Sequence, residues 1–331
     1  MAKKNRRSSG PAQRAGGTRP GTRPASSRPD THGAGADAGA ATAPGAAGAE
    51  ATTRQRRTPV PFVARPFEGL AGEADWVAVR EIVPSAVGTV RTTAEHGAVD
   101  VTIVSLLPDL MPAVRREDGQ VLVALQTVGT SGDASRDVAD ALLRALELEP
   151  GDALTTNDLP EPGPRLQDVL DPAVPFEPEV RDEFDFWLAP GEHAHEVEAA
   201  LENANELIVP TRPVAVPEEL GKAFWCRMNG KEFLRWVVAA AEEETLDALA
   251  RLAARRTAAL EDGARLIGAF RTCGVLVPVW ELVRGTEADE LAEPVAALAE
   301  RLGTALRTTD PLTSDERRAR AGLVSRQVNL R

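Results

Sequence analysis

Residues 224–238 have the sequence FWCRMNGKEFLRWVV, and this stretch decides the fold of the chain's second half. Two apolar, aromatic-rich runs, 224–228 and 233–238, flank the dipeptide formed by Asn229 and Gly230. Asn-Gly readily takes up the two positive φ angles that a two-residue hairpin turn requires. The stretch therefore predicts two neighbouring antiparallel strands.

A second hairpin is predicted further along the chain. Cys273 and Gly274 separate the apolar runs 265–270 and 275–282 in the same way. Between the two hairpins, residues 242–260 have the period of an amphipathic helix. Its predicted apolar face consists of Leu246, Leu249, Leu252 and Ala253.

The first half of the chain shows the same alternation of helix and strand patterns. Residues 73–83 predict a helix that stops at a proline, with Trp76 on its apolar face. The runs 99–107 and 121–126 are apolar and rich in β-branched residues, so they predict strands. Asp133 is placed to cap a following helix.

An order of helix, strand, strand and helix thus occurs in 73–148 and again in 242–306, where Thr286 is placed to cap the last helix. The closing strands, VLVALQ at 121–126 and VLVPVW at 275–280, are similar. Two similar halves from an internal duplication and a chance likeness both remain open. In either case the prediction is an α+β fold, with mostly antiparallel strands covered by amphipathic helices.

The chain divides by composition into five parts. Proline and acidic residues are concentrated in 149–178, which predicts an extended connector with a short helix around 165–170. Residues 184–188 (FDFWL) predict a strand and 195–207 a helix with its apolar side inward. The predicted parts are a disordered basic tail (1–57), a first α+β half (58–148), the connector (149–178), a second α+β half (179–308) and a C-terminal Arg-rich arm (309–331).

The C-terminal arm has two alternative roles, and the tail lacks the residues that would form a core. In the arm, Ser314 is placed to cap a short helix that ends at Gly322; the arm either docks on its own domain or binds a partner. The tail contains no Leu, Ile, Val, Phe or Trp, so it has nothing to bury on folding.

Charge is divided unevenly along the chain. The net charge of −12 is the sum of +8 in residues 1–57 and −20 in residues 58–331. A flexible basic tail suits nucleic acid or ribosome contact through phosphate groups. The competing interpretation is a solubilising leader, or a tether that contacts the chain's own acidic surface. The acidic body instead suits a basic partner.

Composition excludes several classes of protein. The 331 residues include only two cysteines, Cys226 and Cys273, too few for a disulfide scaffold or a four-thiolate zinc site. No apolar run approaches the roughly 20 residues of a membrane span. The N-terminal residues lack the apolar core of a signal peptide. The expected location is cytoplasmic, with reduced cysteines and no membrane contact.

One loop has the features of an anion site. Gly129, Thr130, Ser131 and Gly132 lie between a predicted strand and a predicted helix, where free backbone amides could bind a phosphate. No lysine follows, so the loop is not a P-loop, and Asp133 would repel an anion. A plain capped turn is the competing interpretation.

No other pattern predicts catalysis. His193 and His195, in EHAHE, lack a third ligand at metal-site spacing, and neither cysteine has a local histidine partner. We therefore expect no catalytic residue, no metal and no cofactor.

Several segments together resemble a known family. They are RPFEGLAGEADWVAVREIVPSA (65–86), SGDASRDVADALLRAL (131–146), GPRLQDVLDP (163–172), FWC with LRWVV (224–238) and PLTSDERRARAGL (311–323). The chain resembles, over nearly all of 65–331, the actinobacterial domain of unknown function 5926 family. Relatives are often labelled preprotein translocase SecA-like because some carry an N-terminal SEC-C zinc motif. Residues 1–57 contain no cysteine, so neither zinc nor translocase contact is implied here.

Three hypotheses about function follow. The first is a non-enzymatic cytoplasmic accessory protein whose acidic body recruits a protein partner. The second is a nucleic-acid or ribosome-associated factor that uses residues 1–57. The third is a phosphate- or small-molecule-binding domain, or an enzyme, centred on residues 129–133.

Overall fold

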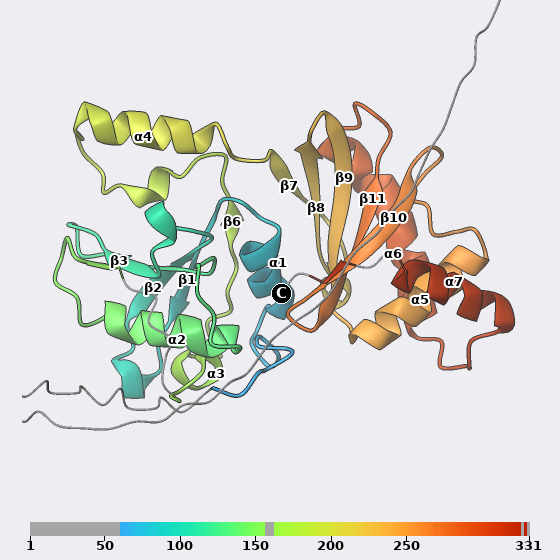
Figure 1. Ribbon diagram of the computed structural model, residues 1–331, viewed down its shortest axis with the longest axis horizontal. Coiled ribbons are helices and arrows are strands. Elements are labelled where there is room, and N and C mark those ends of the chain that lie inside the picture. The colour runs from blue at the N-terminus through green and yellow to red at the C-terminus, as the bar shows by residue number, and fades with distance from the viewer. Residues whose placement is uncertain (1–59, 156–161, 326–327, 330–331) are drawn as a thin grey trace, which may run out of the picture. The chain divides into compact units, whose positions relative to one another are not determined.

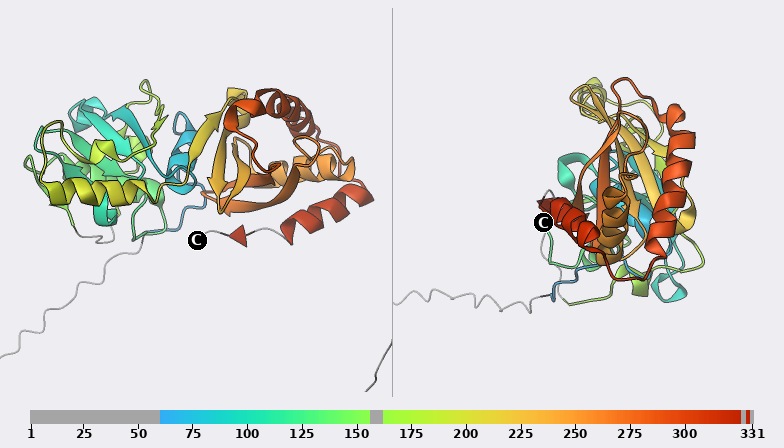
Figure 2. Two further views of the ribbon diagram at one scale, coloured as in Figure 1. Left: turned by 90° about the horizontal axis from the view of Figure 1, so that it is seen from above. Right: turned by 90° about the vertical axis from the view of Figure 1, so that its right-hand side faces the viewer.

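Within the part of the chain that the structure describes, two six-stranded sheets carry the fold. The computed structural model describes residues 60–155, 162–325 and 328–329 (Figures 1 and 2). Among the described strands only two pairs are parallel, so the predicted α+β class with mostly antiparallel strands is confirmed. The predicted tail, residues 1–57, lies outside the described residues.

The first sheet has the strand order β5-β3-β4-β2-β1-β6. Its strands β2 and β4 are parallel, and the other pairs are antiparallel. The strands are β1 (Ala86–Arg91), β2 (Asp100–Val104), β3 (Ala113–Arg115), β4 (Val121–Ala124), β5 (Ala153–Leu154) and β6 (Glu179–Val180).

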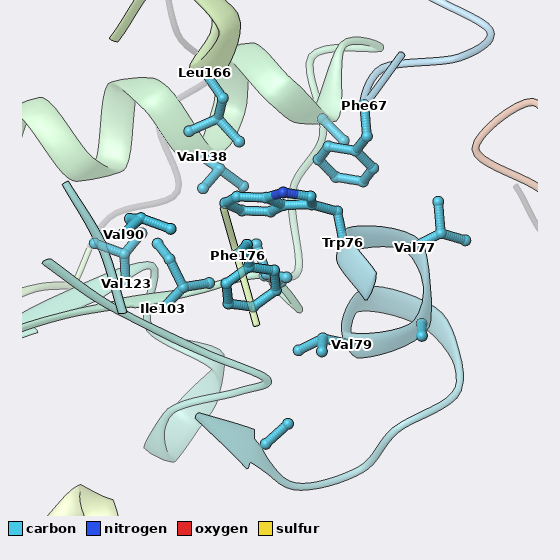
Figure 3. Packing of buried hydrophobic residues seen from close by; sticks show 14 of the residues in the cluster. Phe67, Trp76, Val77, Val79, Val90, Ile103, Val123, Val138, Leu166 and Phe176 are labelled. Atoms are coloured by element: carbon cyan, nitrogen blue, oxygen red, sulfur yellow. The ribbon is translucent and has the colours of Figure 1, made fainter. Parts of the chain in front are cut away.

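Three helices share a core with this sheet: α1 (Glu73–Glu81), α2 (Ala134–Ala145) and α3 (Leu166–Val169). Trp76 lies at the centre of that core, as Figure 3 shows, with its ring centroid 5.9 Å from Phe67 and 4.3 Å from Phe176. A Cβ atom at Gly88 would lie 2.5 Å from the Phe176 ring, so glycine is required there. The predicted burial of the apolar face of α1 is confirmed.

The second sheet has the order β12-β10-β11-β9-β8-β7. Both predicted hairpins are confirmed: β8 pairs with β9 and β10 with β11, both antiparallel. Asn229, Gly230, Cys273 and Gly274 all have positive φ, as tight hairpin turns require. The strands are β7 (Thr211–Val214), β8 (Gly221–Met228), β9 (Lys231–Val238), β10 (Arg265–Thr272), β11 (Val275–Glu281) and β12 (Val328–Asn329).

Helices α5 (Glu242–Ala254), α6 (Ala292–Leu306) and α7 (Ser314–Val324) share the second core. Trp236 and Trp280 are fully buried at its centre. The helix α7 packs against this body through the buried Leu323, which favours the docked alternative for the C-terminal arm. Its cap is Thr313 rather than Ser314, and the helix continues past Gly322 to Val324.

The helix α4 (His195–Asn205) lies between the sheets in sequence. Its helical state is as predicted, but its apolar side is not inward: no residue of α4 is buried, and Val197 is 41% exposed. The strand predicted at 184–188 is also wrong. Residues 185–187 form a 3-10 turn, because Phe184 and Trp187 stack 4.4 Å apart and the indole of Trp187 donates to the carbonyl of Leu106. The short 3-10 turns are η1 (Ala94–His96), η2 (Pro108–Leu110), η3 (Asp185–Trp187), η4 (Glu218–Leu220) and η5 (Ala288–Leu291).

The proline-rich stretch 149–178 takes part in folding. Its described residues form β5 and α3, and Leu166 and Phe176 are buried in the first core. That core also contains Phe224 and Val277 of the second sheet. Residues of both predicted halves thus contribute to one core. The predicted division of the chain into two halves with a connector at 149–178 stays a prediction.

The two similar strands have different partners. β4 pairs in parallel with β2, whereas β11 pairs antiparallel with β10 and with β9. Strand β3 also stands between β2 and β4 in the chain, so the first half departs from the simple order that suggested a repeat. An internal duplication stays a prediction.

Candidate functional site

The loop before α2 bonds to its own chain. The backbone N–H of Ser131 donates to Asp137 (3.1 Å to Oδ2), and the hydroxyl of Thr130 donates to the same carboxylate at 3.0 Å. The N–H groups of Gly132 and Asp133 donate to the hydroxyls of Thr130 and Ser131. An anion would have to displace the Asp137 carboxylate, so the geometry favours a structural turn. Anion binding at residues 129–132 stays an untested prediction.

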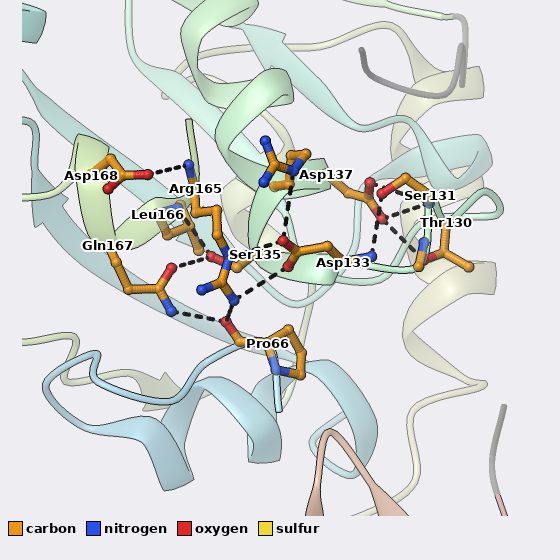
Figure 4. A network of polar contacts seen from close by, with 12 residues as sticks. Pro66, Thr130, Ser131, Asp133, Ser135, Asp137, Arg165, Leu166, Gln167 and Asp168 are labelled. Atoms are coloured by element: carbon orange, nitrogen blue, oxygen red, sulfur yellow. Dashed lines mark hydrogen bonds and ion pairs between the residues drawn. The ribbon is translucent and has the colours of Figure 1, made fainter. Parts of the chain in front are cut away.

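Asp133 lies at the N-cap position of α2, as predicted, but its carboxylate does not cap the helix. It is fully buried and accepts from the guanidinium of Arg165 (2.9 Å to Nε), with Arg136 Nε 3.6 Å away. Arg165 also donates to the carbonyl of Pro66 at 2.7 Å, as Figure 4 shows. A buried carboxylate that is paired in this way is a structural tie between distant segments.

Neighbouring residues extend this tie. The hydroxyl of Ser135 donates to Gln167 at 2.6 Å, and Gln167 donates to the carbonyls of Pro66 and Glu68. The segments 65–86, 131–146 and 163–172 therefore meet at one place. These contacts stabilise the fold, which gives the polar residues of the three segments a structural role rather than a catalytic one.

The histidines and cysteines of the described residues belong to no metal-ligating cluster. The ring of His193 lies 2.7 Å from the carbonyl of Ala189, and the described residues contain no cluster of three or more metal-ligating side chains. Burial raises the pKa of Cys226, and it raises the pKa of Cys273 to about 12. A raised pKa disfavours the thiolate form of both side chains.

A groove of about 750 Å³ lies beside α1, between the edge strands β6 and β7 and the adjoining β8. Its apolar lining includes Val79 and Val83 of α1, Val214 of β7 and Phe224 of β8. A concave, mostly apolar site with a few convergent polar groups is the usual form of a binding site.

Charge in this groove is mainly negative. Its lining includes the carboxylates of Asp75, Glu177, Glu179 and Glu218 and one ammonium group, that of Lys222; of these carboxylates, Glu179 also pairs with Arg181 at 3.2 Å. Asp75 is only 6% exposed and lies 3.0 Å from the Lys222 Nζ. Burial raises the pKa of Asp75 against the lowering effect of Lys222, and Glu177 and Glu218 raise this pKa further. The negative charge around Asp75 thus exceeds what Lys222 neutralises.

Two glycines place these side chains. Gly72, in the left-handed conformation, accepts the backbone N–H of Asp75 at 2.8 Å and starts α1. Gly221 has φ 97°, and a Cβ there would overlap the carbonyl oxygen of Val237. Only glycine therefore fits at position 221, where β8 begins beside β9 and directly before Lys222.

Sequence reasoning missed Asp75, although a signal was present. Asp75, Val79 and Val83 are spaced by four residues, so the acid lies in the apolar stripe of its own helix. A charged residue at such a position is seldom left without a role. The partner Lys222 lies far away in sequence, and no local pattern connects the two.

A second concavity, of about 590 Å³, lies where the turn of the β8-β9 hairpin meets the open end of the β10-β11 hairpin. Its carboxylates are already paired: Glu281 lies 2.9 Å from Lys231 and 2.8 Å from Arg265. Glu232 accepts from Arg227 and from the N–H of Gly285, which lowers the pKa of Glu232. Arg284 is the one charged residue of this lining without an ion pair among the described residues, so the concavity offers a ligand little uncompensated charge.

None of the described helices has the length and apolar character to cross a membrane. Comparison with curated proteins and with solved structures gave no match. The profile of one family, described as a family of unknown function (DUF5926), matches residues 66–331. This match covers the sheets, the buried tie and the groove, and the chain belongs to the DUF5926 family.

Proposed function

We propose that the protein is a non-enzymatic interaction module whose groove binds a basic, extended segment of a partner protein. The observation that carries the proposal is the buried Asp75, which has one half-exposed ammonium beside it and further carboxylates around it. Such an excess of negative charge in a low-dielectric groove attracts a cationic side chain. A cytoplasmic location belongs to this proposal and is supported by the two free cysteines.

The shape of the groove supports an extended ligand. β6 is the last strand of the first sheet and β7 the last strand of the second, and residues of both line the groove. Edge strands carry backbone groups that can pair with an added strand. The apolar lining would receive alternate side chains of that strand, and the carboxylates would receive Lys or Arg.

The test is a titration of the full chain with a fluorescent peptide in which Arg and Val alternate. We expect saturable binding that weakens about tenfold, or by about 1.4 kcal/mol, in the variant Glu177→Gln/Glu179→Gln/Glu218→Gln. These side chains are exposed, so the variant should fold.

The matched control neutralises three exposed glutamates away from the groove: Glu95→Gln, Glu117→Gln and Glu300→Gln. It changes the net charge by the same amount and should bind the peptide like the wild type. Equal weakening in both variants would mean that only overall charge matters, and the groove proposal would be wrong.

Nucleic-acid binding through residues 1–57 is the second candidate, because that segment carries +8 beside a body of −20. Filter binding of total RNA by the full chain tests it, against a variant in which the tail's Lys and Arg are replaced by Gln. A salt-sensitive difference supports the tail. Equal retention of both proteins would reject it.

A further inference from the structure

Helix α4 is folded but contributes no buried residue. Val197 is 41% exposed, and Leu207, just after the helix, is 83% exposed. Figure 1 draws α4 along the upper margin of the ribbon, apart from the strands of the first sheet. A helix normally gains its stability by burying an apolar face. α4 does not, so its exposed apolar side chains remain accessible to a partner.

The charge of α4 is also left uncompensated. Its glutamates and their neighbours are Glu192, Glu196, Glu198, Glu202 and Glu206, and there is no Lys or Arg between residues 182 and 211. Within the described residues, no ion pair involves any of these five side chains.

This arrangement lowers the stability of the helix. Glu198, Glu202 and Glu206 follow each other at a spacing of four residues, where like charges repel. The last two also lie near the negative end of the helix dipole, and no basic residue lies in the last turn.

The segment that contains α4 is nevertheless anchored at both of its ends. Arg212 pairs with both carboxylate oxygens of Asp182, and this ion pair joins the two ends of the segment 182–212 that contains α4. The side chain of Asn205 accepts the N–H of Phe184 at 2.8 Å, and Phe184 stacks on Trp187. The chain therefore fixes the position of α4 without covering it.

We infer that α4 is a second docking surface, separate from the groove, and that its occupant is a basic amphipathic helix of a partner protein. Val197 and Leu201 are four residues apart, and the stripe formed by Glu198 and Glu202 lies one position further round the helix. A partner helix with an apolar stripe beside Lys or Arg at the same spacing matches both. The glutamates disfavour phosphate-rich ligands and a second copy of α4, because like charges repel.

The test uses a synthetic amphipathic helix of Leu, Ala and Lys as the probe. Hydrogen exchange of the full chain should show new protection over residues 195–205. Calorimetry should give an affinity that falls about tenfold in Glu198→Gln/Glu202→Gln/Glu206→Gln and again in Val197→Ser/Leu207→Ser. Circular dichroism should show that both variants remain folded, since none of these side chains is buried.

Controls separate this inference from the proposed function. The groove variant Glu177→Gln/Glu179→Gln/Glu218→Gln should bind the helical probe like the wild type while losing the extended peptide. Protection at the groove instead of α4 would overturn the inference and leave the proposed function standing. Equal binding of a scrambled probe of the same composition would also overturn it, because charge alone would then explain the contact.

Discussion

Helices α4 and α5 come from similar sequence patterns and have opposite environments. Both are rich in glutamate, and both have apolar residues at helical spacing. α5 buries Leu246, Leu249 and Leu252, among others, whereas α4 buries nothing. Periodicity predicts that a stretch is helical, but it does not say whether another element of the chain will cover it.

Their charges differ in the same direction. Glu242 of α5 pairs with Arg271, and Glu243 and Asp247 pair with Arg320 of α7. The acids of α5 thus serve contacts inside the molecule. Those of α4 lack such contacts in the described part of the chain, which is why we assign them to a partner.

The largest expected effect tests burial directly. Leu249→Ala in α5 should lower the free energy of unfolding by about 2–5 kcal/mol, because it leaves a cavity in the second core. Val197→Ala in α4 should change it by no more than about 0.5 kcal/mol. Urea unfolding of both variants measures the difference. A comparable loss in the two would show that α4 is packed as tightly as α5.

A pH titration distinguishes two acids, Asp75 and Glu316, whose environments shift their pKa in opposite directions. Burial raises the pKa of Asp75 above its ordinary value of 3.8, so the folded state binds this proton more tightly than the unfolded state. The stability of the wild type relative to Asp75→Asn should therefore fall as pH rises from below 3.8 through the raised pKa.

The capping residue Glu316 gives the opposite sign. The backbone N–H of Thr313 lowers the pKa of Glu316, so the wild type should gain stability over Glu316→Gln as pH rises through this lowered pKa. Unfolding free energies over an acid pH series measure both slopes. Slopes of the same sign would contradict the assigned environments.

Removing the contacts that hold α7 on α5 should have a smaller effect. Arg320→Ala should cost about 0.2–1 kcal/mol, the range of exposed ion pairs. Hydrogen exchange should then increase over residues 314–324 and remain unchanged over α4. The exposed Arg318→Ala is the control; a larger loss there would place the important contact elsewhere.

The smallest expected effect concerns α4 itself. Glu202→Lys/Glu206→Lys should stabilise the helix by about 0.2–0.5 kcal/mol, because Glu198 then has an opposite charge four residues further along and the dipole is better matched. The same variant should lose the helical probe. Thermal unfolding and the binding assay measure the two effects. A gain of stability without loss of binding would show that the charge of α4 does not contribute to docking.

Local features were predictable because their causes are local. The turns at Asn229-Gly230 and Cys273-Gly274 depend on the φ angles of two residues, so the hairpins follow from the sequence. The burial of Trp76 follows from its place in an apolar stripe. The strand predicted at 184–188 failed because aromatic stacking and a bond to Leu106, distant in sequence, outweighed strand propensity.

The sequence by itself determined the fold class, both hairpins, the helical segments and the uneven charge, since each depends on neighbouring residues. The tertiary structure decided which acids are paired: Asp133 with Arg165, Asp75 with Lys222, and the glutamates of α4 with no described residue. Burial and ion pairing depend on groups brought together from distant parts of the chain, and Coulomb interactions act across space rather than along sequence. The candidate groove and α4 became recognisable only when those distances were known.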